Sequence, residues 1–322
     1  MARTSRYAPD RGLTVRMTVT MFLLGLVFVA FVALIIGIMT AVHASGAAIV
    51  LVALIFGGGS AILSLFFSDK IALAAAGAVE VTPQQAPELH GIVDRLCALA
   101  DMDKPRVAIA PTQMPNAFAT GRNSKNSVLC VTEGLLSPRL GLEKEELEGI
   151  LAHELSHVAH KDVQVMTVAS LLAIVAALLV RFAFYSELFG GGRRGNDQNA
   201  FPVILIIMAV SAVVYAISFL LIRLLSRYRE LAADRSGALL TGQPSKLASA
   251  LQKVSSGMNR IPTEDLRTAQ PLNAFYFAPA MKLNAGASLS TLFSTHPSLE
   301  KRIEQLEKIQ RQLGQVTPGT PR

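Results

Sequence analysis

Four long runs of apolar residues interrupt the polar pattern of this chain: 17–41, 47–67, 163–189 and 201–222. As a helix rising about 1.5 Å per residue, each can cross the roughly 30 Å of hydrocarbon in a bilayer. The first run exceeds the apolar segment of a signal peptide, about 7–15 residues, and the second follows it almost at once. The pattern therefore predicts an uncleaved anchor and four transmembrane helices, paired as two hairpins.

The basic residues predict which side of the membrane each polar block faces. With both termini inside, all of the 30 Lys and Arg residues are cytoplasmic except Arg181, Arg193 and Arg194, in keeping with the excess of positive charge on that side. The two large polar blocks then share the cytoplasm and form one domain, which the second hairpin splits. The predicted order is a basic tail (1–16), a first transmembrane hairpin (17–67), the first part of the domain (68–162), a second hairpin (163–222), the second part of the domain (223–313) and a disordered tail (314–322).

Periodicity and boundary residues predict the local structure of the two polar blocks. Short β-rich runs at 106–110 and 127–132, joined by a stretch that contains Pro and Gly, predict a small sheet. Segment 261–287 has no periodicity and is predicted as loop. The predicted helices are 87–102, 142–161, 223–240 as a continuation of the fourth apolar run, and 297–313.

Composition agrees with a membrane protein and excludes several other classes. Hydrophobic residues make up 51% of the chain and charged residues only 16%, whereas an ordinary soluble domain is nearer a quarter charged. Disordered, fibrous and disulfide-rich secreted proteins are excluded. Cys97 and Cys130 fall in the predicted cytoplasmic part and are interpreted as free thiols. The net charge of +7 is interpreted as membrane orientation, and no nucleic-acid partner is expected.

The predicted helix 142–161 contains His153-Glu154-Leu155-Ser156-His157, an H-E-x-x-H motif. Residues four apart lie on one helix face, so both imidazoles can reach one ion, and Glu154 is placed to deprotonate water there. By chance the motif would occur roughly 0.005 times in a chain of this composition. The alternative is a pair of structural histidines. The apolar stripe of the helix runs along a different face, and this favours a metal site.

A catalytic zinc needs a third protein ligand. His160 shares the face, but from there it would point along the helix away from the ion, and a supporting or surface role is favoured. Further along the chain, Glu230 and Asp234 are four apart on one predicted helix. One of them can bind the metal while the other hydrogen-bonds a ligating histidine. The spacing alone leaves open a solvated acidic pair among the neighbouring arginines Arg227, Arg229 and Arg235.

Taken together, the motifs resemble a known family. They are HELSH, then two apolar runs, then RYRELAADRSGA, with PNAFATG (115–121), VTEGLL (131–136) and FSTHPSLEKRI (293–303). This ordered set covers essentially the whole chain and resembles the HtpX-type membrane zinc metalloproteases, relatives of the CAAX prenyl proteases. The loop after the third run and the C-terminal tail depart from the family pattern. The resemblance implies a mainly α fold: four transmembrane helices and a cytoplasmic, zincin-like α+β metallopeptidase domain split by the second hairpin.

The resemblance also implies roles for individual residues. His153, His157 and Glu230 would bind one Zn²⁺ per chain, Glu154 would be the general base and acid, and Asp234 would hydrogen-bond a ligating histidine. Two further residues have open alternatives. Asn116 would lie near the substrate groove, where peptides can add as a strand, or is a turn residue after Pro115. His296 would donate to the tetrahedral oxyanion, or caps a helix.

The function implied by the resemblance is hydrolysis of peptide bonds in damaged or misassembled membrane proteins and in unfolded proteins. This is stress-related quality control on the cytoplasmic side of a bacterial inner membrane, with functional overlap with other membrane proteases. One alternative is a specialised processing protease of the prenyl-protease type, although four spans are few to enclose a chamber. The other is a membrane scaffold with a vestigial metal site, against which the intact Glu154 counts.

Spacing further predicts where the metal lies. Only six residues separate His157 from the third apolar run at Val163, roughly 9 Å if helical. The third-ligand helix begins directly from the fourth run. We therefore expect the metal close to the cytoplasmic membrane surface.

Overall fold

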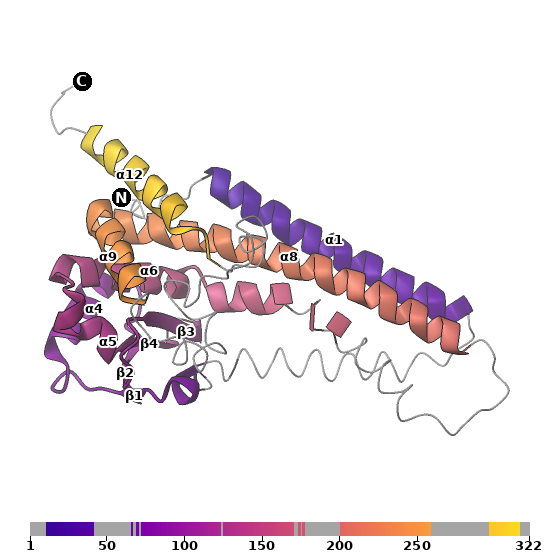
Figure 1. The fold of residues 1–322 in the computed structure, drawn as a ribbon, viewed down its shortest axis with the longest axis horizontal. Coiled ribbons are helices and arrows are strands. Elements are labelled where there is room, and N and C mark those ends of the chain that lie inside the picture. Colours follow the sequence, from indigo (N-terminus) through magenta and orange to yellow (C-terminus); the bar gives the residue numbers. More distant parts are fainter. Residues whose placement is uncertain are drawn as a thin grey trace. The chain divides into compact units, whose positions relative to one another are not determined.

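A computed structural model describes residues 11–41, 66, 69–70, 72–123, 125–170, 173–174, 176–177, 200–258 and 296–315. Most of these residues are helical, and one small sheet accompanies the helices (Figure 1). The chain divides into two compact units. One includes Phe66–Val163 and Ser226–Arg322, and the other includes Val15–Leu65 and Gln164–Leu225.

Two long apolar helices dominate the second unit, α1 (Arg11–Ala41) and α8 (Ala200–Thr241). Among the described residues, two stretches are long and apolar enough to cross a membrane, Arg11–Phe31 and Leu205–Thr241, with mean hydropathies of 2.0 and 2.7. Only 17% and 11% of the residues in their most apolar windows are buried. A core helix of a soluble protein would bury most of this surface, so the exposed apolar side chains favour contact with lipid.

The other predicted spans are described only in part. Run 47–67 lies outside the described residues apart from Phe66. In the third run, residues 163–170 are helical, as are the short described pieces after them. The fourth run lies within α8, which continues without a break to Thr241, as the prediction for 223–240 required. The four-span arrangement stays a prediction.

The sheet in the first unit has four strands in the order β1-β2-β4-β3. They are β1 (Val79–Glu80), β2 (Arg106–Ala110), β3 (Ala117–Asn123) and β4 (Asn126–Thr132). β2 and β4 are parallel, and β3 pairs with β4 antiparallel, so β3 is an edge strand of the described sheet. Gly121, at the bulge of this hairpin, has φ +131°, and a Cβ there would lie 2.2 Å from the Asn126 carbonyl oxygen. Glycine is therefore required at this position.

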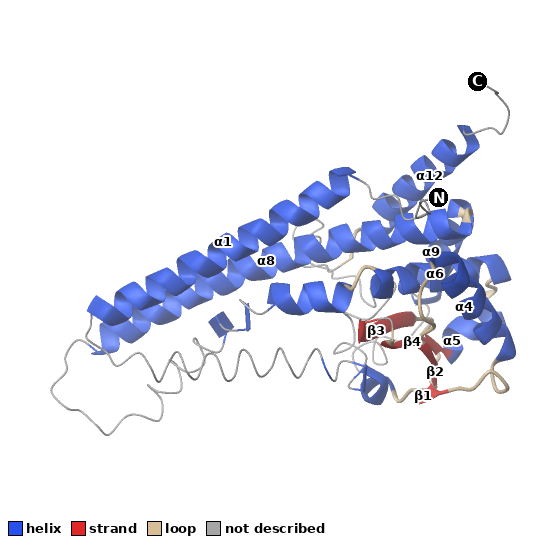
Figure 2. Cartoon of the chain, turned by 180° about the vertical axis from the view of Figure 1, so that it is seen from behind, coloured by secondary structure: helices blue, strands red, loops and turns tan. Residues whose placement is uncertain are grey.

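The main core lies on the side of the sheet that Ala117, Leu129 and Val131 line. Helices α4 (Pro87–Ala100), α6 (Lys144–Ala159) and α9 (Pro244–Met258) contribute their apolar faces to it, and α12 (Leu299–Gln315) packs on α9 (Figure 2). A second cluster around Phe118 and Cys130 lies on the opposite face. The short helix α5 (Glu133–Leu136) and the 3-10 turn η2 (Pro138–Leu140) connect β4 to α6.

Helix α6 owes its position to its first turn. Glu143 and Glu146 form a capping box, in which the Glu143 N–H donates to Glu146 Oε2 at 2.7 Å. The buried Glu146 carboxylate also accepts from Ser249 and Lys253 of α9, at 2.6 and 2.7 Å. The same residue thus starts the helix and attaches α9 to it.

The predicted helices 87–102, 142–161 and 297–313 are confirmed within two or three residues at each end, as are the strands 106–110 and 127–132. Strands β1 and β3 and helix α9 were not predicted. Segment 261–287 lies outside the described residues. Cys97 and Cys130 are buried free thiols, and burial raises their pKa values to about 11 and about 12, so neither is a reactive nucleophile.

Candidate metal centre

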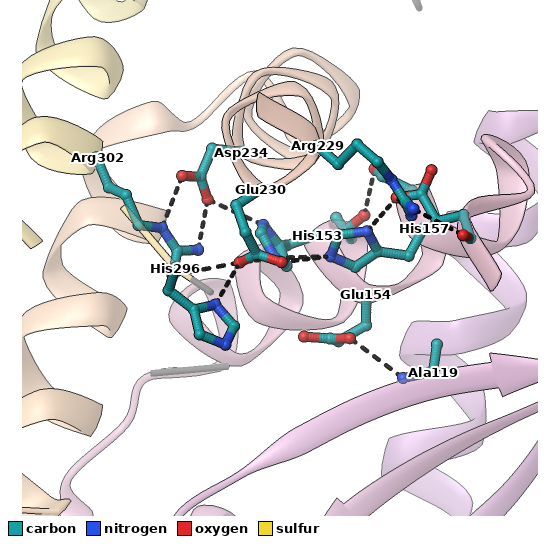
Figure 3. A network of polar contacts seen from close by, with 12 residues as sticks. Ala119, His153, Glu154, His157, Arg229, Glu230, Asp234, His296 and Arg302 are labelled. Carbon is teal, nitrogen blue, oxygen red and sulfur yellow. Dashed lines mark hydrogen bonds and ion pairs between the residues drawn. The ribbon is translucent and has the colours of Figure 1, made fainter. Parts of the chain in front are cut away.

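Three predicted ligands come together from two helices. His153 and His157 lie one turn apart on α6, and Glu230 faces them from α8 (Figure 3). Their ligand atoms all lie within 4.8 Å of one another. His153 and Glu230 are buried, and the His157 side chain is 16% exposed. The centre is thus largely withdrawn from solvent while one ligand keeps contact with it.

A glycine allows the two helices to approach closely. Gly237 of α8 packs against the backbone of α6 at His153. A Cβ on Gly237 would be 2.9 Å from His153 N and 3.1 Å from its Cα. Backbone atoms cannot move aside as a flexible side chain can. Any larger residue would push α8, with Glu230, away from the histidines.

The spacing of the donor atoms fits a tetrahedral ion. The two histidine Nε2 atoms are 3.2 Å apart; Glu230 Oε1 lies 3.4 Å from His157 Nε2, and the other oxygen, Oε2, lies 3.7 Å from His153 Nε2. Ligand bonds of about 2.0–2.1 Å at tetrahedral angles would separate neighbouring donors by about 3.3–3.4 Å. Two imidazoles and a carboxylate are also the donor set of many catalytic zinc sites.

A buried carboxylate faces the other ring nitrogen of each histidine. His153 Nδ1 lies 2.9 Å from Asp234 Oδ1, and His157 Nδ1 lies 2.5 Å from Asp162 Oδ2. A carboxylate accepts a hydrogen bond from a protonated Nδ1, so a neutral ring held in this way presents an unprotonated Nε2. Two such nitrogens facing each other cannot share a hydrogen bond. A cation between them would accept both lone pairs and make the short distance favourable.

Each carboxylate is in turn paired with a buried arginine. Arg302 of α12 donates from Nε and Nη2 to Asp234, both at 2.7 Å. Arg229 of α8 pairs through Nη2 with Asp162 and donates from Nη1 to the Asp162 carbonyl at 2.7 Å. We call the sets His153–Asp234–Arg302 and His157–Asp162–Arg229 the first and the second histidine arm. Three of their members, Asp162, Arg229 and Arg302, were not predicted from the sequence.

The electrostatics of α6 suit a metal ligand beside a general base. Burial lowers the pKa of His153 to about 4, against the opposing charge of Asp234, so its imidazole is neutral near pH 7. Burial raises the pKa of Glu154 to about 8; the His157 charge opposes the rise and the Glu230 charge adds to it. Glu154 Oε2 accepts a hydrogen bond from the Ala119 N–H of edge strand β3 at 3.2 Å. This carboxyl group is poised to exchange a proton in the neutral pH range.

The remaining predicted residues lie around this centre. His296 is buried, and its Nδ1 is 3.0 Å from Glu230 Oε2. Asn116 immediately precedes β3, and its backbone N–H donates to Thr132 Oγ1 at 2.9 Å. His160 caps the C-terminus of α6, and its Nε2 is 3.3 Å from Ser236 Oγ of α8. His160 therefore points to α8 and lies outside the set of three clustered ligands.

Comparison with known proteins shows which family this chain resembles. The profile of peptidase family M48 matches residues 83–310, which contain both histidine arms. Protease HtpX homolog 1 of Streptomyces coelicolor is 58% identical over 316 residues, which cover 98% of this chain and 99% of the relative. Protease HtpX homolog of Moorella thermoacetica is 48% identical over 305 residues, 94% and 96% of the two chains.

An archaeal relative shows the same likeness at greater distance. Protease HtpX homolog of Pyrococcus furiosus is 42% identical over 252 residues, 78% of this chain and 83% of the relative. With the family profile, the relatives and the clustered H-E-x-x-H histidines and Glu230, the chain belongs to peptidase family M48, as an HtpX-type metalloprotease.

Proposed function

We propose that this metalloprotease is a zinc-dependent membrane endopeptidase. In this proposal His153, His157 and Glu230 hold one Zn²⁺, and Glu154 is the general base and acid. The observation that carries the proposal is the donor spacing of 3.2, 3.4 and 3.7 Å beside a buried carboxyl group. When bound, the ion supplies Lewis acidity toward water and the scissile carbonyl.

The protein's own groups carry the proton. Glu154 takes a proton from the attacking water and passes it to the leaving amine, which a carboxyl group with a pKa of about 8 can do in both directions. His153 and His157 each direct Nδ1 to a carboxylate, which leaves Nε2 of each ring facing the other ligands. Asp234 is the residue that orients His153, through the 2.9 Å contact.

His296 is proposed to stabilise the oxyanion of the tetrahedral intermediate. Its Nδ1 faces the Glu230 carboxylate at 3.0 Å, where it donates a hydrogen bond. A neutral imidazole with a proton on Nδ1 has an acceptor at Nε2. His296 therefore donates to an oxyanion from Nε2 only in its protonated form, and otherwise its role is to orient Glu230.

Edge strand β3 is proposed to bind the substrate backbone. It is an edge strand of the described sheet, and its Ala119 N–H donates to Glu154 Oε2. A peptide added as a further strand would pass the general base. Asn116, at the start of this strand, is proposed to contact the substrate.

The membrane arrangement is proposed as four spans with both termini and the split peptidase domain, 68–162 and 223–313, in the cytoplasm of a bacterial cell. The unbroken helix α8 supports it, because the apolar run 201–222 and Glu230 lie on the same helix. Glu230 is eight residues beyond Ile222, about 12 Å along a helix axis. A metal near the cytoplasmic surface would give access to damaged or misassembled membrane proteins, the proposed substrates.

Glu154→Gln tests the chemistry. The purified full-length chain and this variant are compared for bound zinc and for cleavage of casein or of the chain itself. We expect one zinc per chain in both and cleavage reduced by about 10²–10⁴-fold in the variant, as for loss of a general base. Glu145→Gln, an exposed position on the same helix, is the matched control and should cleave normally. Undiminished cleavage by zinc-loaded Glu154→Gln contradicts the mechanism.

The substrates need a second experiment. Cells that carry the native chain or Glu154→Gln are compared for the membrane proteins that accumulate. Accumulation of misassembled membrane proteins only with the variant supports quality control. Accumulation of a single precursor would indicate a processing protease instead.

A further inference from the structure

We infer that Asp162, held in place by Arg229, is a positioning residue for the metal ligand His157. The inference rests on the proposed metal site and adds a residue to it. Asp162 lies five residues after His157, beyond the end of α6, and its Oδ2 is 2.5 Å from His157 Nδ1. Its side chain is only 6% exposed, so water does not compete for this contact.

The turn after α6 brings the Asp162 side chain back toward the end of that helix. Helix α6 ends at Ala159, His160 caps it, and Lys161 takes a left-handed conformation with φ 57°. Such a conformation is unfavourable for a residue with a side chain. The next helical segment begins at Asp162. The reversal therefore places this carboxylate beside the histidine one turn before the helix end.

Arg229 fixes Asp162 in two places. Its Nη2 pairs with Asp162 Oδ2, the same oxygen that faces His157, and its Nη1 donates to the Asp162 backbone carbonyl at 2.7 Å. The Arg229 side chain is 6% exposed. Because Arg229 precedes Glu230 on α8, it connects the orientation of His157 to the helix that provides the third ligand.

The contact has a chemical consequence for His157. This ring is 16% exposed against 1% for His153, so packing restrains it less. The carboxylate fixes the proton on Nδ1, turns Nε2 toward the other ligands and makes the imidazole a stronger donor to a metal. Loss of such a partner weakens metal binding by about 10–100-fold in known sites.

Asp162→Asn tests the inference without relying on activity. Zinc affinity is measured on the full-length chain by competition with a chelator, together with the visible spectrum after cobalt substitution and the melting temperature of the metal-free chain. We expect zinc affinity to fall about 10–100-fold and the cobalt bands to shift. Glu148→Gln is the matched control: Glu148 is also a buried carboxylate on α6, but its ion pair is with Arg95 and not with a histidine. Its zinc affinity should stay within about twofold of native.

A second variant covers the case in which Asp162→Asn leaves Arg229 unpaired and the chain unfolds. Asp162→Asn with Arg229→Leu removes both charges and should fold with the same loss of zinc affinity. Native zinc affinity in either folded variant, or an equal loss in Glu148→Gln, overturns the inference while the proposed zinc site stands. A native chain that binds no zinc overturns the proposed function and this inference with it.

Discussion

The two histidine arms have the same chemistry but are assembled in opposite ways. In the first arm α8 provides the carboxylate, Asp234, and the arginine comes from α12. In the second arm α8 provides the arginine, and the carboxylate, Asp162, comes from the start of the helical segment that follows α6. The first arm thus depends on the docking of a helix near the C-terminus, whereas the second is complete once α6 and α8 meet.

Both arms are buried, and the first is slightly more so. Asp234 is fully buried and Arg302 is 2% exposed, while Asp162 and Arg229 are each 6% exposed. A carboxylate withdrawn this far from water depends on its partner, because an unpaired buried charge is strongly destabilising. The first arm therefore links metal geometry to the docking of α12, whereas the second arm links it to the contact between α6 and α8.

The largest expected effect is the loss of stability when the arginine of the first arm is replaced, and the same change in the second arm is the comparison. Arg302→Met leaves Asp234 buried without its bidentate partner and should lower the free energy of unfolding by about 3–5 kcal/mol. It should also increase hydrogen exchange in α12, as measured by mass spectrometry. Arg229→Met should destabilise less and leave exchange in α12 unchanged. Equal exposure of α12 in both variants would show that the arms are not independent.

The double variant Asp234→Asn with Arg302→Met checks the cause of this effect. If the cost comes from the unpaired carboxylate, removing both charges should restore more than half of the stability that Arg302→Met loses. No recovery would indicate that packing of the Arg302 side chain, and not its charge, holds α12.

An intermediate effect is expected from a substitution at Gly237, where α8 packs against α6 beside His153. In Gly237→Ala, the new Cβ would lie 2.9 Å from His153 N, so α8 must move. We expect a loss of about 1–3 kcal/mol in unfolding free energy together with weaker zinc binding in a chelator competition. Gly91→Ala, at an exposed position of α4 with open space around the added Cβ, should instead be neutral or slightly stabilising. Unchanged zinc affinity in Gly237→Ala would contradict the tight contact.

The smallest expected effect concerns His160, the histidine beyond the second arm. Burial lowers its pKa to about 4, and the charges of His157 and Arg229 lower it further. Because the pKa in the folded chain is below that of the unfolded chain, near 6.5, its stabilising contribution is present above pH 6.5 and is lost as the pH falls through 4. When the pH is lowered from 7 to 4.5, the native chain should therefore lose about 1 kcal/mol more unfolding free energy than His160→Gln does. Parallel pH–stability curves from chemical denaturation would contradict this.

What could be predicted from the sequence was set by the range of each interaction. The pair His153 and His157 follows from helical spacing alone, and so does the shared face of Glu230 and Asp234. Helix α6 was predicted from its apolar period and acidic first turn, and β2 and β4 from their β-branched runs. Each of these signals lies within one element.

The missed residues act across elements. Asp162 was predicted only as the boundary residue before the third apolar run, and Arg229 was noted only as one of the arginines around Glu230 and Asp234. Arg302 lies in a helix whose charged composition gave no sign of a buried position. An aspartate five residues after the motif and an arginine just before the third ligand were visible, but only the turn at Lys161 and the approach of α8 show what they contact. The edge strand β3 was missed because Ala117, Ala119 and Gly121 give little β signal.

The unbroken course of α8 limits how the metal centre can move. Arg229, Glu230 and Asp234 lie within six consecutive positions of one helix, so a ligand, a carboxylate and an arginine translate and rotate as one rigid body. The two histidines form a second body on α6. Apart from side-chain rotations, the centre can then change only as the two helices move relative to each other. The contacts of Asp234 with His153 and of Arg229 with Asp162 resist that movement.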